Sequence, residues 1–148
     1  MYGYRYVEHL IGRTITKAAR SKTSIGTSER YPERGCMVEI TSAESVGKKE
    51  VRSGVHAAQL GYGERLHAQK VEFEPGAGGT TPHDHPHEQI TYITAGELIL
   101  RIDGEDHHLS EGDTVIIPGD VPHAARNESE DHAALLDVFS PPRDDLME

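Results

Sequence analysis

Hydrophobic and polar residues alternate over short segments of this chain, which is the pattern of half-buried β-strands. Residues 65–73 (RLHAQKVEF) alternate in this way, so His67 and Gln69 share one face with Val71 and Phe73. The turn-rich stretch PGAGGTTP follows and predicts a loop. The alternation alone leaves open whether His67 faces the interior or the solvent.

Three further segments continue the β pattern toward the end of the chain. QITYITAGELILRIDG, residues 89–104, predicts two strands around an Ala-Gly pair, with Asp-Gly as a hairpin turn. DTVIIPGD, residues 113–120, predicts a strand that ends at a proline and a glycine, and HAALLDVFSPP, residues 132–142, predicts a last apolar strand that two prolines terminate. Many short strands, frequent turns and almost no helical periodicity indicate an all-β sandwich or barrel.

The N-terminal segment differs from this β region in composition and charge. Residues 1–36 show neither helical nor strand periodicity. They are rich in Ser, Thr, Gly and charged residues, which favours disorder. They carry seven Lys/Arg against three Asp/Glu, whereas the remaining 112 residues carry eight against 22, so the balances are +4 and −14. We expect a poorly structured extension over residues 1–36 and one domain over residues 37–148, with Met37 as the natural start. A basic arm that docks on the acidic body or on a partner is the alternative.

Composition narrows the classes of partner and the compartment. The acidic body argues against nucleic acid as a partner, because phosphate would be repelled. The single cysteine, Cys36, excludes an internal disulfide framework and suits a reducing compartment. No apolar run of the sequence approaches membrane-spanning length. We therefore expect a soluble cytoplasmic protein with a small-molecule partner and no nucleic-acid or membrane partner.

Candidate metal ligands lie in the segment HDHPHEQ. His83, His85, His87 and Gln89 occupy every second position, so their side chains point to the same side of an extended chain. Two same-side histidines that are two residues apart can chelate a metal through nitrogens about 2.1 Å from it. A stable site needs further ligands, which Gln89 and the distant His123, after a Pro-rich turn, are placed to supply.

HDHPHEQ and the residues around it resemble the first motif of the cupin superfamily. His83 and His85 match the two histidines of that motif, and Gly96 matches its closing glycine. Gln89 stands where the family carries a glutamate, and Ala77 stands where the motif begins with a glycine.

The segment GDTVIIPGDVPHAARN resembles the second cupin motif. Asp120 stands where that motif has a glycine, and the matching positions are Gly112, Pro118, His123 and Asn127. The double resemblance implies a single-domain cupin, an all-β double-stranded β-helix or jelly-roll barrel. A homodimer is a further expectation for small members of the family.

The resemblance also implies one divalent metal ion, held by His83, His85, Gln89 and His123. Three imidazoles and an amide leave the charge of the metal uncompensated, which favours Lewis-acid chemistry on an anionic substrate over oxygen chemistry. Imidazole and oxygen ligands suit Zn, Ni, Fe, Mn or Co and do not distinguish among them. His87 is expected beside the ligands rather than among them, with a role as a ligand as the alternative.

The last predicted strand carries an acidic residue in an apolar segment. Asp137 shares one face with Phe139, and a buried carboxyl group requires a partner or a purpose. One interpretation is a salt bridge, for instance to an arginine such as Arg143 or Arg101. The other places Asp137 near the metal as a general acid/base, with Arg143 gripping a substrate carboxylate.

HxHPHEQITY together with DVFSPPR resembles the pectin-degradation cupins, which convert cyclic 4,5-unsaturated uronates into the linear 5-keto-4-deoxyuronate. Asp137, Phe139 and Arg143 match catalytic residues of that subfamily by type and spacing. The resemblance implies a metal-dependent isomerase- or lyase-type enzyme that acts on a small carboxylated sugar. In it Asp137 moves protons, Arg143 neutralises the carboxylate and Phe139 packs against the sugar ring. A metal-dependent dioxygenase or polyketide-type cyclase, and a non-catalytic cupin that binds a small metabolite, are the alternatives.

Overall fold

The computed structural model describes residues 39–42 and 45–147 of the chain. The predictions for residues 1–36, and Met37 as the natural start, lie outside the described residues. No helix in the described part is long and apolar enough to cross a membrane. This part contains nine strands and one short 3-10 helix: β1 (Lys49–Arg52), β2 (Val55–Tyr62), β3 (His67–Phe73), β4 (Glu88–Ala95), β5 (Glu97–Ile102), β6 (Glu105–Ser110), β7 (Thr114–Ile117), β8 (His123–Arg126), β9 (Ala133–Ser140) and η1 (Asp144–Leu146).

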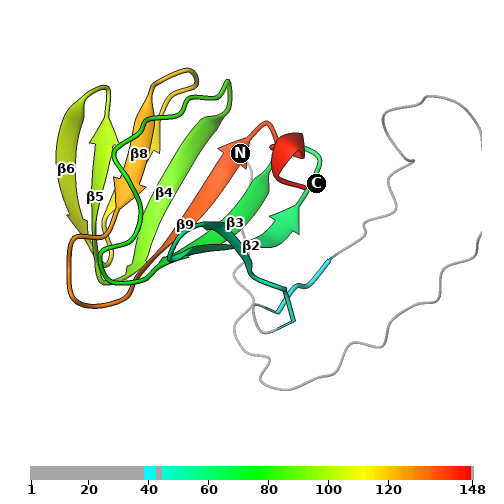
Figure 1. The fold of residues 1–148 in the computed structure, drawn as a ribbon. Coiled ribbons are helices and arrows are strands. Elements are labelled where there is room, and N and C mark those ends of the chain that lie inside the picture. Colours follow the sequence, from blue (N-terminus) through cyan, green and yellow to red (C-terminus); the bar gives the residue numbers. More distant parts are fainter. Residues whose placement is uncertain (1–38, 43–44, 148) are drawn as a thin grey trace, which may run out of the picture. The chain divides into compact units, whose positions relative to one another are not determined.

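The strands form two antiparallel sheets, as Figure 1 shows. The larger sheet has the order β1-β2-β3-β9-β4-β7 and the smaller one the order β6-β5-β8. Strand β9 therefore lies between β3 and β4, although it follows both of them much later in the sequence. The predicted all-β jelly-roll barrel is confirmed, and its apolar core is built from Val55, Ala57, Val71, Phe73, Ala77, Ile93, Leu98, Leu100, Ile117, Ala133 and Leu135.

The alternation in β3 positions polar side chains inside the barrel. Its odd-numbered residues are buried and its even-numbered residues are partly exposed. His67 and Gln69 therefore face inward with Val71 and Phe73, and His67 has no exposed surface (0%). The interior placement of His67, one of the two alternatives from its pattern, is the one that the structure shows.

Strand β9 alternates in the same way from Leu135 onward and pairs with β3. In the register of this pair, Gln69 lies opposite Asp137 and His67 opposite Phe139. On the other side of β9, Thr91 of β4 lies opposite Asp137. Asp137 is therefore flanked by polar residues from both neighbouring strands, on the inward face of the sheet.

Positive backbone φ angles explain part of the motif pattern. Gly96 has φ of +70°, and a Cβ there would lie 2.7 Å from the carbonyl oxygen of His132. Asp120, which replaces a motif glycine, adopts φ of 63°. Aspartate tolerates this left-handed conformation better than most residues, so the fold keeps the turn without the glycine.

Candidate metal site and its pocket

The candidate ligands come from three places that the barrel brings together. His83 and His85 lie in the loop before β4, Gln89 is in β4, and His123 begins β8. The loop and β8 are joined at His83 and His123, where each backbone N–H donates to the other residue's carbonyl at 2.9 Å. The register that places these two side chains together is thus set by the backbone.

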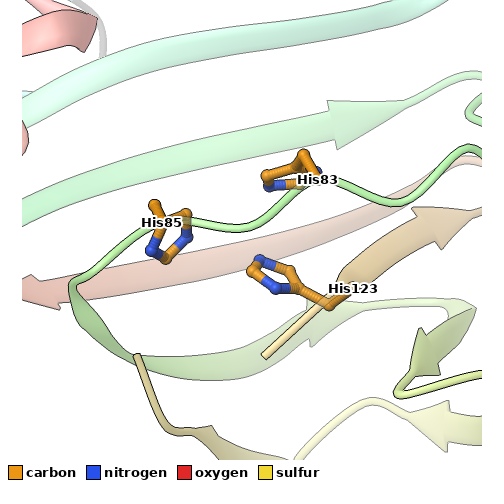
Figure 2. Close-up of side chains that lie close together, drawn as sticks. All are labelled: His83, His85 and His123. Carbon is orange, nitrogen blue, oxygen red and sulfur yellow. The ribbon is translucent and has the colours of Figure 1, made fainter. Parts of the chain in front are cut away.

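The three histidines converge on one point, as Figure 2 shows. Each offers one ring nitrogen, and these nitrogens all lie within 4.8 Å of one another. The ring of His123 lies 4.4 Å from that of His83 and 5.0 Å from that of His85, measured between centroids. His85 and His123 are buried, whereas His83 is exposed. The arrangement can hold a metal ion that is open to solvent on the His83 side.

Hydrogen bonds to the backbone set the tautomers of the two buried rings. His85 Nδ1 lies 3.1 Å from the carbonyl oxygen of His87, and His123 Nδ1 lies 2.8 Å from that of Val121. Each Nδ1 must carry the proton and donate, which leaves a lone pair on each Nε2. His123 Nε2 is buried without a hydrogen-bond partner in the described part of the chain. This is the state that a metal ligand requires.

Gln89 presents its oxygen to the same point. Its Nε2 donates to Thr91 Oγ1 and to Asp137 Oδ1, both at 2.8 Å, so Oε1 is turned toward His85 Nε2 at 3.1 Å. These two facing atoms are both acceptors, and two lone pairs repel unless a proton or a cation lies near them. The donor set therefore fits a bound cation.

Asp137 is held by neutral donors. Thr91 Oγ1 donates to its Oδ1 at 2.6 Å, and Gln69 Nε2 lies 3.4 Å from its Oδ2. Burial raises the pKa of Asp137, while hydrogen bonds from Thr91, Gln69 and Gln89 oppose that rise. The carboxyl group lies in the pocket wall and contacts the candidate ligand Gln89 directly.

In the part of the chain that the structure describes, Asp137 forms no salt bridge with Arg143 or Arg101, so the salt-bridge interpretation is wrong for these two partners. Arg143 forms its ion pair with Asp145, and Arg101 forms its own with Asp106. Neither guanidinium contacts Asp137, because the neighbouring strands supply amide and hydroxyl donors to its carboxyl group instead.

Two of the three imidazoles, those of His83 and His85, have a lowered pKa. Partial desolvation, together with His123, His85, Arg143 and Arg52, lowers the pKa of His83 to about 4. Burial, Arg143 and His123 also lower the pKa of His85. Both rings therefore keep a lone pair available for a metal at neutral pH.

A pocket of about 600 Å³ opens beside these ligands, with Asp137, Phe139 and Arg143 in its wall. Phe139 is only 1% exposed; its ring meets His85 edge-on at 5.6 Å, and the Arg143 guanidinium lies 5.3 Å from its centroid. Phe139 thus contacts both a candidate ligand and an arginine of the pocket wall. A direct contact between Phe139 and a substrate stays a prediction.

His87 lies beside the three histidines. Its ring is 5.6 Å from that of His85, and its Nδ1 lies 2.7 Å from the carbonyl oxygen of Pro141. It thereby ties the ligand-bearing loop to the segment after β9. Its role outside the ligand set stays a prediction.

Four residues near the site were not singled out from the sequence, namely Arg52, Gln59, Gln69 and Thr91. Arg52 lines the pocket, and its guanidinium lies over the loop that leads to His83; a Cβ at Gly79 would come within 2.6 Å of its Nη1. The alternation of β3 could have identified Gln69, because it shares an inward face with Val71. No sequence pattern identifies Arg52, since it lies in a strand whose side chains are all exposed.

The jelly-roll fold and the histidine cluster are those of a cupin, and the sequence comparison supports the same class of protein. The chain belongs to the cupin family, and its residues 69–139 match the Cupin_2 family of cupin domains. More narrowly, it is a cupin similar to KdgF. It is 33% identical over 100 residues to the pectin degradation protein KdgF of Dickeya dadantii, which covers 67% of this chain and 89% of that protein.

Solved structures agree with this placement. KdgF from a Halomonas species superimposes with a TM-score of 0.68 at 32% identity, covering 74% of this chain and 99% of that one. An RmlC-like cupin from Shewanella frigidimarina gives a TM-score of 0.68 at 31% identity, with 74% and 96% covered.

Proposed function

We propose that this protein is a metal-dependent enzyme that converts 4,5-unsaturated uronate to linear 5-keto-4-deoxyuronate. One observation carries the proposal: His85 Nε2 and Gln89 Oε1 face each other as acceptors 3.1 Å apart, and Asp137 holds the amide of Gln89 in that orientation. The similarity to proteins named for pectin degradation supports the substrate class.

His83, His85, His123 and Gln89 would hold one divalent ion. Such an ion acts as a Lewis acid that polarises a substrate oxygen and lowers the pKa of a bound hydroxyl group. All four ligands are neutral, so an anionic substrate would find an uncompensated positive charge at the site. The carboxylate of Asp137 contacts this ligand set through the amide of Gln89.

Asp137 would move the proton of the reaction. Ring opening requires the anomeric hydroxyl to lose its proton as the bond between C1 and the ring oxygen breaks. The electron pair of that bond stays on the ring oxygen, which becomes the enolate oxygen on C5, and protonation of the C4–C5 double bond at C4 gives the ketone. A buried carboxyl group with a raised pKa is suited to take up the first proton and to return it at C4. The conversion is an isomerisation and needs no oxidant.

Two arginines would bind the substrate carboxylate. Arg143 uses Nε and Nη2 to hold Asp145 bidentately, which leaves the N–H groups of Nη1 for a substrate. Arg52 supplies a second guanidinium on the His83 side of the pocket. Both lower the pKa of His83, so both act electrostatically at the mouth of the candidate site. A homodimer stays a prediction that this site does not require.

The test follows the ultraviolet absorbance of an unsaturated uronate monomer mixed with the metal-loaded protein. We expect rapid loss of absorbance, and a rate about 100-fold to 10,000-fold lower for Asp137→Asn, the range of general acid–base catalysis. Asp103→Asn, an exposed carboxylate in a hairpin turn, is the matched control and should behave as the wild type. An uncatalysed rate with metal-loaded wild-type protein would refute the assignment.

Two further measurements separate the alternatives. Elemental analysis should find one divalent ion per chain. An iron-loaded sample should consume no oxygen with uronates or phenols, whereas steady uptake would instead favour a dioxygenase.

A further inference from the structure

A chain of hydrogen-bonded side chains runs along the inward face of the larger sheet to Asp137. His67 Nε2 lies 2.7 Å from Gln59 Oε1, and Gln59 Nε2 donates to Gln69 Oε1 at 3.1 Å. Gln69 Nε2 then points to Asp137 Oδ2 at 3.4 Å. Strands β2, β3 and β9 contribute these residues, and Gln59, Gln69 and Asp137 line the pocket.

The donors of this chain all point toward Asp137. Because Gln59 Oε1 is an acceptor, His67 Nε2 must be the donor. In the same way, the amide nitrogen of each glutamine donates to the next residue toward Asp137. The other carboxyl oxygen, Oδ1, receives the hydroxyl of Thr91 and the amide of Gln89. The carboxyl group of Asp137 is therefore the last acceptor of the hydrogen-bond chain that starts at His67, and it also orients the candidate ligand Gln89.

A contribution to folding stability does not explain why these hydrogen-bonded side chains are present. His67 is 0% exposed, its Nδ1 is buried without a hydrogen-bond partner in the described residues, and burial and Arg143 lower its pKa, so the ring is neutral. An unpartnered buried nitrogen costs free energy that an apolar side chain on the same face would not. The neighbouring inward positions of β3, Val71 and Phe73, are apolar.

We propose that His67, Gln59 and Gln69 are positioning residues that orient the Asp137 carboxylate and, through it, the amide of Gln89. This rests on the proposed function. The chain fixes the rotation of the carboxyl group about its last bond, since it supplies the donor for Oδ2 while β4 supplies those for Oδ1. Without these hydrogen bonds, Asp137 would stay in place but its carboxyl group would rotate more freely. The amide oxygen of Gln89 would then be directed less firmly at the metal.

The experiment uses the full-length protein with His67→Met and Gln69→Leu, which keep roughly the same volume. We expect kcat for the uronate and metal affinity each to fall about 10-fold to 100-fold, as for other outer partners of metal ligands. KM should stay within about twofold, because neither side chain is proposed to bind the substrate. The melting temperature should fall modestly, because each substitution leaves a partner in Gln59 or Asp137 without its hydrogen bond, so kcat is compared at a temperature at which both variants stay folded. His107→Met, exposed in β6, is the control for a histidine lost elsewhere.

A double-mutant cycle separates positioning from a general structural effect. In an Asp137→Asn background, His67→Met should reduce kcat no further, because its effect passes through Asp137. Multiplicative losses would overturn the proposal, as would an unchanged kcat in His67→Met.

Two readouts do not depend on turnover. Nitrogen–proton NMR of the imidazoles should show His67 as the Nε2–H tautomer in the wild type and a changed signal in Gln59→Leu. If the wild type does not turn over uronates, the proposed function fails, and metal affinity then decides this inference. An unchanged metal Kd in Gln69→Leu, or an Nδ1–H tautomer of His67, would overturn it.

Discussion

Replacing Gln89 by glutamate tests how the site distributes its charge. The amide Nε2 of Gln89 lies 2.8 Å from Asp137 Oδ1, so Gln89→Glu places a carboxylate oxygen where a donor now stands. Two unit charges at that separation repel by about 6 kcal/mol at an effective dielectric constant of about 20. The pair will avoid that repulsion by holding one proton, which raises the folded-state pKa of the pair above that of free carboxyls.

The sign of the pH dependence follows from that raised pKa. The folded variant binds a proton that the unfolded chain releases above about pH 4, so its stability falls as pH rises. Between pH 5 and pH 8, the metal-free variant should lose up to about 4 kcal/mol more unfolding free energy than the wild type, at about 1.4 kcal/mol per pH unit.

Denaturant unfolding of the metal-free proteins at the two pH values measures this difference. The double variant Gln89→Glu/Asp137→Asn is the control, because it restores one amide and one carboxylate across the same contact. It should recover most of the lost stability at pH 8. Equal pH profiles for Gln89→Glu and the wild type would refute the contact between Gln89 and Asp137 as described.

Further predictions address the ligands, the pocket and the loop. His123→Ala should lower metal affinity by more than about 100-fold with the fold retained, measured by calorimetric titration and circular dichroism. Arg143→Lys should raise KM for the uronate about tenfold, the effect of losing one charged hydrogen bond of about 1.5 kcal/mol; an unchanged KM would exclude substrate binding there. Because the pKa of His83 is lowered to about 4, protons should compete for this ligand only in acid; half of the metal lost by about pH 6.5 in equilibrium dialysis would contradict this. Gly78→Ala should cost at least about 3 kcal/mol, since its Cβ would lie 2.6 Å from a backbone oxygen, whereas Gly76→Ala, with positive φ but nothing within 4 Å, should cost about 1–2 kcal/mol in thermal unfolding.

Local alternation predicted the strands with apolar faces, but it did not identify every strand. RLHAQKVEF and HAALLDVFSPP alternate in sequence and form β3 and β9. Strand β6 (EDHHLS) has almost no buried side chains and exists because its backbone pairs with β5 at the edge of the smaller sheet. Strand β1 is exposed along its whole length. Backbone pairing of this kind leaves no hydrophobic pattern to read.

The candidate ligands followed from spacing, whereas their supporting contacts did not. The alternate spacing of the histidines and Gln89 in HDHPHEQ places their side chains on one side of an extended chain, which predicts them as candidate metal ligands. The partners of Asp137 depend on β9 lying between β3 and β4, so that Gln69 and Thr91 both lie opposite it. That register joins segments tens of residues apart, and nothing in the local pattern of either segment predicts it.

The backbone bridge between His83 and His123 bears on how the metal would bind. Each residue's N–H donates to the other's carbonyl, and these bonds involve no side-chain atom. The backbones of the two candidate ligands are thus held together by this bridge, so less conformational entropy remains to be lost when an ion arrives. A zinc finger, by contrast, folds only with its metal. Here the barrel would tolerate repeated loading, loss and exchange of the ion without unfolding, and the metal supply of the cell could determine which ion the site carries.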